Sequence, residues 1–127
     1  MASKRVLIID DERLVRKTTE LLLRQVNMEA ISVASGAEGI EAAKKEQPDL
    51  ILLDLVMPDM DGWQVLSRLK ADPASEKIPV IVFTAGDFSF SDQRIKQRGA
   101  IGVCRKPFQL QQLLKIIKET DSEIKHE

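Results

Sequence analysis

Short apolar runs recur along this chain and alternate with segments of helical pattern. Three of the runs contain no polar residue, as expected of strands that are buried on both faces of a parallel sheet. A fourth run, residues 30–33, is interrupted by Ser32 and suits a strand nearer the edge of the sheet. Residues 100–104 form a fifth candidate strand. The three unbroken runs are residues 6–9, 50–53 and 80–83.

The segments between the runs carry apolar or small residues every three or four positions, which predicts helices with one buried face. Pro48 ends the second of these helices, and the third ends before Asp72. Residues 88–98 have only Phe88 and Ile95 on one face, so the pattern there predicts a short or mobile helix. The four clear faces are Val15, Thr18, Leu22 and Val26; Gly36, Ile40 and Ala43; Gly62, Val65, Leu66 and Leu69; and Leu110, Leu113, Leu114 and Ile117.

The order of these elements predicts the fold class. Five alternations of strand and helix in one short chain indicate an α/β fold, in which a doubly wound, five-stranded parallel sheet lies between helices as a three-layer sandwich with five helices. The length of 127 residues suits one domain. We expect the domain to span residues 1–120, with residues 121–127 as a charged tail and no second domain.

Composition excludes several classes of function. The net charge of −1 produces no overall field that would attract nucleic acid or an anionic membrane, so neither is an expected partner. A single cysteine, Cys104, cannot form an internal disulfide or a zinc site of several thiolates. The only histidine, His126, lies in the tail. No apolar segment is long enough for a signal peptide or a membrane span, so the expected location is the cytoplasm.

Polar residues follow four of the five predicted strands. Asp10 and Asp11 come directly after the first strand, Asp54 follows the third, Thr84 ends the fourth, and Lys106 follows the fifth. Parallel strands all end at the same edge of a sheet, and ligands bind at that edge where the strand order reverses. We therefore expect these side chains to be neighbours in space.

Three carboxylates held together would repel one another. Each pair at about 4 Å costs about 4 kcal/mol at an effective dielectric constant near 20, so a proton or a cation must enter. Mg²⁺ fits best, because it prefers oxygen ligands and also accepts phosphate oxygens. Lys106 adds a positive charge and Thr84 a hydroxyl donor. Together these groups are the parts that phosphoryl transfer requires.

Plainer interpretations apply to each residue alone. An aspartate at a strand end is most often a turn former or a helix cap, and a single lysine is usually a solvated surface charge. Residues 59–62 also resemble the D-x-D-G segment of haloacid-dehalogenase-type phosphatases, but Pro58 breaks the strand that such a nucleophile follows. Two alternatives therefore stay open: a small phosphohydrolase with an aspartate nucleophile, and an interaction module that is independent of phosphorylation.

Four ordered motifs resemble the receiver domain of two-component response regulators, of which the chemotaxis receiver is a familiar member. The first strand with its acidic pair matches at residues 6–12, the phosphoacceptor strand and loop at 52–62, the threonine strand at 80–85, and the lysine loop at 106–108. The resemblance covers essentially the whole chain. It implies the flavodoxin-like strand order within the predicted fold class.

The resemblance also implies a role for each site residue. Asp54 would accept a phosphoryl group from a phosphohistidine on a sensor histidine kinase or a phosphotransfer protein. Mg²⁺ would be bound by Asp11 and Asp54 directly, by Asp10 through a water, and by the backbone carbonyl of Val56. Lys106 would pair with the phosphoryl oxygens, and Thr84 would donate a hydrogen bond to one of them. The peptide bond from Lys106 to Pro107 would be cis.

The family resemblance further implies a signalling role rather than an enzyme with turnover. The chain would catalyse only its own phosphorylation and dephosphorylation, and would change its affinity for an unidentified downstream protein through the fourth helix, fifth strand and fifth helix. A monomer or weak dimer is expected. Val103 stands where relatives often carry an aromatic residue, and Val56 and Gly86 have no side chain that could position an attacking water.

Overall fold

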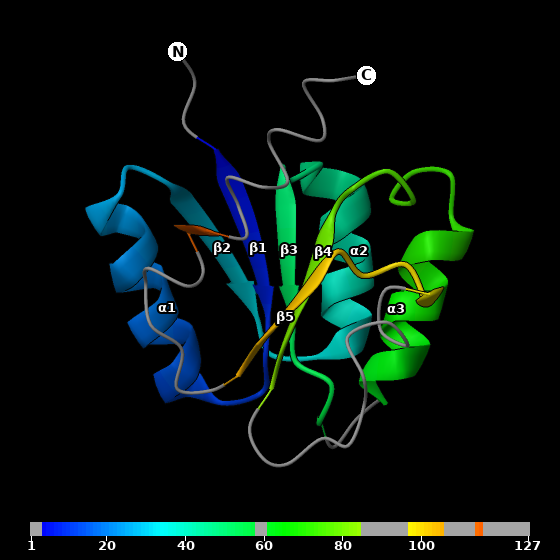
Figure 1. Cartoon of the computed structure of the whole chain (residues 1–127), viewed down its shortest axis with the longest axis horizontal. Coiled ribbons are helices and arrows are strands. Elements are labelled where there is room, and N and C mark those ends of the chain that lie inside the picture. Colours follow the sequence, from blue (N-terminus) through cyan, green and yellow to red (C-terminus); the bar gives the residue numbers. More distant parts are fainter. Residues whose placement is uncertain (1–3, 58–60, 85–96, 106–113, 116–127) are drawn as a thin grey trace.

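A computed structural model describes residues 4–57, 61–84, 97–105, 114 and 115 of the chain. Five strands form one sheet in the order β2-β1-β3-β4-β5, and every neighbouring pair is parallel. This is the flavodoxin-like order, so the predicted fold class is confirmed. The elements are β1 (Arg5–Ile9), α1 (Arg13–Gln25), β2 (Glu29–Val33), α2 (Gly36–Glu46), β3 (Leu50–Leu53), α3 (Gly62–Ala71), β4 (Val80–Thr84) and β5 (Gly102–Arg105) (Figure 1).

The sheet lies between helices on both faces. Figure 1 shows α1 on one side of the sheet, and α2 and α3 on the other. Alternate residues of each central strand point to opposite faces, as the twofold period of a strand requires. In β1, Leu7 and Ile9 belong to the cluster that includes α2 and α3, whereas Val6 and Ile8 belong to the cluster that includes Leu23 of α1. Both faces of the central strands are therefore buried against helices. Strands in that position need apolar side chains on both faces, which explains their unbroken apolar sequences.

The edge position predicted for the interrupted second strand is confirmed. β2 pairs only with β1, and none of its five residues is fully buried. The fifth strand begins at Gly102, two residues later than the predicted start. Ala100 is nevertheless buried, and the Ile101 N–H donates to the carbonyl of Val80, so the chain joins the sheet before the regular pairing begins.

The second and third helices follow the sequence prediction closely. All four residues of the predicted α3 face are buried, and α3 ends at Ala71, immediately before Asp72. Ser35 caps α2 by accepting a hydrogen bond from the Glu38 N–H, and Gln47 leaves the helix in a left-handed conformation with φ of 47° just before Pro48.

The buried face of α1 is shifted by one position from the predicted face. Thr18 is exposed, and the buried positions are Thr19 and Leu23. The hydroxyl of Thr19 donates to the Val15 carbonyl at 2.7 Å, so this polar group can be buried at little cost. Leu21 points outward with 60% of its surface exposed. The three consecutive leucines at 21–23 made the helical face ambiguous in the sequence.

Two further predicted helices fall almost wholly outside the described residues. In the segment 88–98, the structure describes Gln97 as helical. In the last predicted helix, it describes Leu114 and Lys115 as helical, and Leu114 is half-buried. The tail at 121–127 also lies outside the described residues. Within the described part of the chain, no helix has the length and apolar character needed to cross a membrane.

The two leucines of α1 provide a matched test of its buried face. We expect Leu23→Ala to lower the free energy of unfolding by about 2–5 kcal/mol, because it leaves a cavity under the sheet. Leu21→Ala removes the same atoms from an exposed site and should change the free energy of unfolding by less than about 0.5 kcal/mol. Urea denaturation of both variants measures the difference, and equal losses would contradict the assignment of the buried face.

Candidate functional site

Three carboxylates meet at the carboxyl end of the sheet. Asp10 directly follows β1 and Asp54 directly follows β3, and these two strands are neighbours in register. The Asp54 N–H donates to the Ile9 carbonyl at 3.0 Å, so the pairing continues one step past both strands. One carboxylate oxygen each from Asp10, Asp11 and Asp54 lies within 4.8 Å of the others. The adjacency of β1 and β3 thus creates the cluster.

The two strand-end carboxylates are buried and oriented by local hydrogen bonds. Asp10 is fully buried and Asp54 is 2% exposed. An oxygen of Asp10 accepts from the Glu12 N–H at 2.9 Å, and an oxygen of Asp54 accepts from the Val56 N–H at 3.1 Å. Asp11 is half-buried and is the most exposed of the three carboxylates.

This donor set fits a hard divalent cation. Carboxylates that are this close and this poorly hydrated repel strongly, and a bound cation relieves that repulsion. Mg²⁺ takes oxygen ligands, keeps several waters and rarely needs a complete protein cage. The three carboxylates satisfy those requirements and leave room for other oxygen ligands.

The structure describes the position of Thr84 but not that of Lys106. Thr84 is the last residue of β4, and its backbone pairs with Arg105 at the end of β5. It therefore lies at the same edge of the sheet as the carboxylates. Lys106 follows Arg105 directly, but it lies outside the described residues, together with Pro107, the predicted cis bond and Gly86. Their predicted roles stay predictions.

The loop after Asp54 is held against the start of α3. The Gly62 N–H donates to the Leu55 carbonyl at 3.0 Å. A Cβ added at Gly62 would lie 2.3 Å from the Leu55 Cα and 2.7 Å from the Asp54 carbonyl oxygen, so only glycine allows this approach. Asp61 caps α3 by accepting from the Trp63 N–H. The start of α3 therefore fixes the backbone next to Asp54.

Residues beyond Asp54 alternate between the core and solvent. Leu55 and Met57 are buried, whereas Val56 between them has 61% of its surface exposed. The Val56 side chain consequently points away from the core while its N–H contacts the Asp54 carboxylate. Val103 is half-buried in β5 and packs against the α2 and α3 side of the core.

Sequence reasoning missed Arg16. Its guanidinium Nη1 donates to the backbone carbonyl of Asp10 at 2.8 Å, so it reaches the acidic turn from one turn inside α1. An arginine in an amphipathic helix is normally a solvated charge, and nothing in the one-dimensional pattern separates Arg16 from Arg13 or Lys17. Only the direction of the side chain reveals the contact.

Cys104 has the properties of an inert thiol. It is 1% exposed, and burial raises the pKa of its thiol to about 11. The thiolate, which is the reactive form, is therefore scarce at neutral pH.

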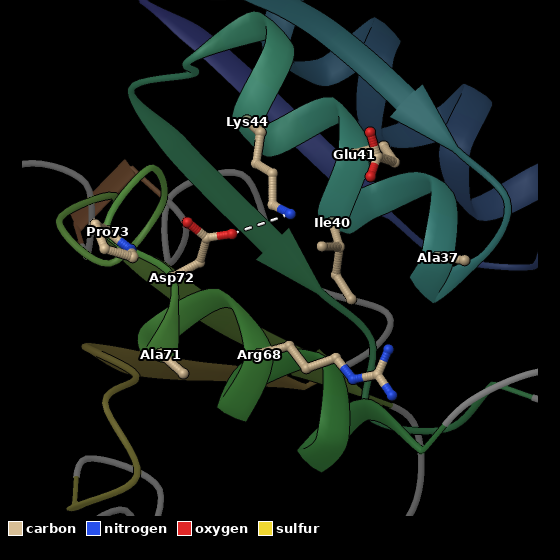
Figure 2. Close-up of a pocket in the computed structure, with 8 residues that line it drawn as sticks. All are labelled: Ala37, Ile40, Glu41, Lys44, Arg68, Ala71, Asp72 and Pro73. Atoms are coloured by element: carbon tan, nitrogen blue, oxygen red, sulfur yellow. Dashed lines mark ion pairs between the residues drawn. The ribbon is translucent and has the colours of Figure 1, made fainter.

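A hollow of about 660 Å³ lies between α2 and α3, and none of the three carboxylates lines it. Figure 2 shows Lys44 and Asp72 pointing toward each other across one end of it, with Nζ and Oδ2 3.0 Å apart. The pKa of the Asp72 carboxyl is lowered, first by the Ala74 N–H and then by Lys44. This ion pair links two exposed helix ends, and the hollow lacks the grouped carboxylates of the sheet edge.

Comparison with known proteins places the chain in a family. The family model described as the response regulator receiver domain matches residues 6–118. The chain belongs to this family of two-component signalling proteins, in which phosphorylation and Mg²⁺ binding are typical. Receiver domains are generally phosphoacceptors rather than enzymes with turnover.

Individual relatives agree with this assignment. The polar-differentiation response regulator DivK of Brucella ovis is 34% identical over 116 residues, which cover 91% of this chain and 94% of DivK. Protein PilG of Pseudomonas aeruginosa is 31% identical over 114 residues, covering 90% of this chain and 84% of PilG. The solved structure of the chemotaxis protein CheY4 of Vibrio cholerae matches with a TM-score of 0.84 and 28% identity, covering 93% of this chain and 98% of CheY4.

Two glycines test the importance of the close approach beside Asp54. Gly62→Ala should lower the free energy of unfolding by at least about 2 kcal/mol, because its Cβ meets backbone that cannot rotate away. In Gly39→Ala the new Cβ meets only side-chain atoms of the buried Ile9, which must shift but are not backbone, and the higher helix propensity of alanine offsets about 1 kcal/mol of the loss. Thermal and urea unfolding compare the two. A larger loss for Gly39→Ala would contradict this account of the loop.

Proposed function

We propose that this chain is a phosphorylation-controlled receiver in which Asp54 accepts a phosphoryl group from a phosphohistidine on a sensor histidine kinase or a phosphotransfer protein. The observation that carries the proposal is the grouping of Asp10, Asp11 and Asp54 within 4.8 Å at the carboxyl edge of the sheet. Family membership supports the same chemistry. Neither alternative from the sequence has a comparable observation in its favour.

In this proposal the carboxylates of Asp10, Asp11 and Asp54 and the carbonyl of Val56 hold Mg²⁺, with Asp10 acting through a water. The bound ion supplies positive charge that orients and polarises the incoming phosphoryl group. Asp10 suits a fixed outer position, because it is fully buried and accepts from the Glu12 N–H. The backbone of Val56 suits a ligand, because its N–H already holds it beside the Asp54 carboxylate.

Asp54 is proposed as the nucleophile. One of its oxygens forms a bond to phosphorus while the phosphorus–nitrogen bond of the phosphohistidine breaks, which gives an acyl phosphate. The hydrogen bond from the Val56 N–H leaves Asp54 pointing toward the other two carboxylates. Lys106 would pair with the phosphoryl oxygens, and Thr84 would donate a hydrogen bond to one of them. The place of Thr84 at the end of β4 supports its part.

The signalling output would be a shift between two conformations. The phosphoryl group binds one arrangement of Thr84 and its loop better than the other and favours it by that difference in free energy. The responding surface would include β5 and the helices on either side of it in sequence. We also propose residues 1–120 as the receiver unit and 121–127 as a tail, which the family match over 6–118 supports. The cytoplasmic location and the weak tendency to dimerise stay predictions.

Exposed apolar side chains support a protein as the phosphoryl donor. Among the described residues, the large hydrophobic side chains that are strongly exposed are Leu14, Leu21 and Val56. Val56 is two residues after Asp54, and Leu14 is in the first turn of α1, three residues after Asp11. Leu21 is seven residues further, on the same side of the helix. We propose that these residues contact the donor protein beside the reacting groups.

Phosphorylation itself can be tested by mass spectrometry. Incubation with a small acyl-phosphate donor and Mg²⁺ should add one phosphoryl group to the chain, and Asp54→Asn should prevent it. Chelation of the metal should slow the reaction by at least about tenfold, a barrier change of about 1.4 kcal/mol. A steady-state assay on a generic phosphate ester provides the control. Sustained turnover there would instead support the phosphohydrolase alternative.

Contact with the donor protein can be separated from the chemistry. Leu14→Ser should leave phosphorylation by the small donor unchanged, because the Leu14 side chain is 77% exposed and has no polar group that could take part in phosphoryl transfer. Transfer from the phosphorylated histidine kinases of the native cell, tested one by one, should slow by about fivefold or more for the cognate kinase. Unchanged transfer from every kinase would remove this surface from the proposal.

A further inference from the structure

Hydrogen bonds with other described residues hold Asp10 in the turn that carries the acidic pair. Its N–H donates to the Val33 carbonyl at 3.2 Å, and its carboxylate accepts from the Glu12 N–H at 2.9 Å. Its backbone carbonyl accepts from Arg16 Nη1 at 2.8 Å. The first two bonds come from the sheet and from the turn itself. The third comes from a side chain that none of the proposed roles includes.

The carbonyl that Arg16 binds belongs to the peptide unit between Asp10 and Asp11. Because a peptide unit is planar, holding its oxygen fixes the orientation of the whole unit. That orientation determines the direction in which the chain enters Asp11, and therefore where the Asp11 carboxylate points. Asp11 itself makes no side-chain hydrogen bond among the described residues. Its position depends on the backbone on either side.

The ordinary means of fixing a helix start is missing at this turn. Glu12 is the N-cap of α1, and its side chain makes no capping hydrogen bond. The first turn of α1 also contains no acidic residue. It carries Arg13 and Arg16 instead, and positive charge is unfavourable at the N-terminal end of a helix. Arg16 therefore occupies a position that helix stability alone does not favour.

Arg13 and Arg16 share a charge and a helical turn but differ in contacts. Arg16 is half-buried and donates to Asp10, in a hydrogen bond strengthened by its charge. Arg13 is exposed, and its side chain makes no hydrogen bond or ion pair with the part of the chain that the structure describes. The chain thus contains its own comparison between a nearby charge and a positioned donor.

We infer that Arg16 is a positioning residue for the acidic cluster. Its guanidinium holds the peptide between Asp10 and Asp11 so that the Asp11 carboxylate lies beside Asp10 and Asp54, and this raises the affinity of the cluster for a divalent cation. The inference rests on the proposed function, because it assigns Arg16 a part in the same site. Arg16 touches neither the reacting atoms nor the ion.

The first experiment measures metal affinity in three variants. Mg²⁺ binding is followed by calorimetry, and Mn²⁺ binding by electron paramagnetic resonance of the free ion. Arg16→Met should raise both dissociation constants by about tenfold, the effect of losing one charge-assisted hydrogen bond. Arg13→Met removes the same charge without that bond and should leave the constants unchanged or slightly lower. Arg16→Lys keeps the charge and can donate from its ammonium group but lacks the planar guanidinium, so its constants should lie between those of Arg16→Met and the wild type.

The second experiment needs no metal. In the metal-free protein, the carbonyl ¹³C resonance of Asp10 and the amide resonance of Asp11 should shift in Arg16→Met and not in Arg13→Met. Circular dichroism establishes that each variant is folded at the temperature used. If Arg16→Met unfolds, the same two resonances are compared between Arg16→Lys and the wild type. Lysine retains the charge and has an aliphatic stem of similar length.

The third measurement separates positioning from chemistry. With a small acyl-phosphate donor, Arg16→Met should need about tenfold more Mg²⁺ for half-maximal phosphorylation, yet approach the wild-type rate at saturating Mg²⁺. Wild-type metal affinity in Arg16→Met would overturn the inference. So would equal effects of Arg13→Met and Arg16→Met, which would assign the change to net charge. If the wild-type chain bound no divalent ion at all, the proposed function would fail together with the inference.

Discussion

The repulsion among three carboxylates at one edge of the sheet is the constraint on which the rest of the site depends. Asp10 and Asp54 are almost entirely removed from water, and Asp11 lies beside them. Such an arrangement is unfavourable unless a cation or a proton enters, because the low dielectric of the surroundings strengthens every like-charge interaction. Contacts around the cluster fix the positions of the three groups.

Those contacts come from both sides of the sheet. On one side, Arg16 of α1 and the Glu12 N–H hold the turn after β1. On the other, Gly62 brings the start of α3 against the backbone after β3. Beneath them, the dry core of β1 and β3 gives the two strand ends a fixed separation. A small shift of any of these supports would move a carboxylate, since a close-packed interior transmits displacement.

The membership of the receiver family and the geometry of the cluster lead to the same chemistry. The family match covers residues 6–118. The geometry rests on a parallel sheet in which the first and third strands are neighbours. A phosphoacceptor needs the carboxylates close enough to share a cation, and an exposed side through which a donor can approach. Among the described residues, Asp11 is half-buried and the Val56 side chain is exposed.

Much of the fold and the cluster could be predicted because local patterns and one topological rule suffice. Unbroken apolar runs predicted the central strands, Ser32 predicted the edge strand, and the spacing in α3 predicted its buried face. Parallel strands end at one edge, and the strand order implied by the family resemblance puts the first and third strands side by side, so the carboxylates were expected to be neighbours. Local patterns did not predict the buried face of α1 correctly, because three consecutive leucines are compatible with two different faces. Packing against the sheet buries Thr19 rather than Thr18.

By itself, then, the order of residues determined which groups end each strand and which chemistry they can perform, because strand polarity converts positions in the chain into positions at an edge. Only the tertiary structure decided how those groups are held. The contact from Arg16 to the Asp10 carbonyl and the approach of Gly62 to Asp54 depend on the direction of a side chain and on the packing of a helix against a loop. Gly62 belongs to the matched motif at residues 52–62, but neither contact follows from a period or a spacing, so both become visible only when the chain is folded.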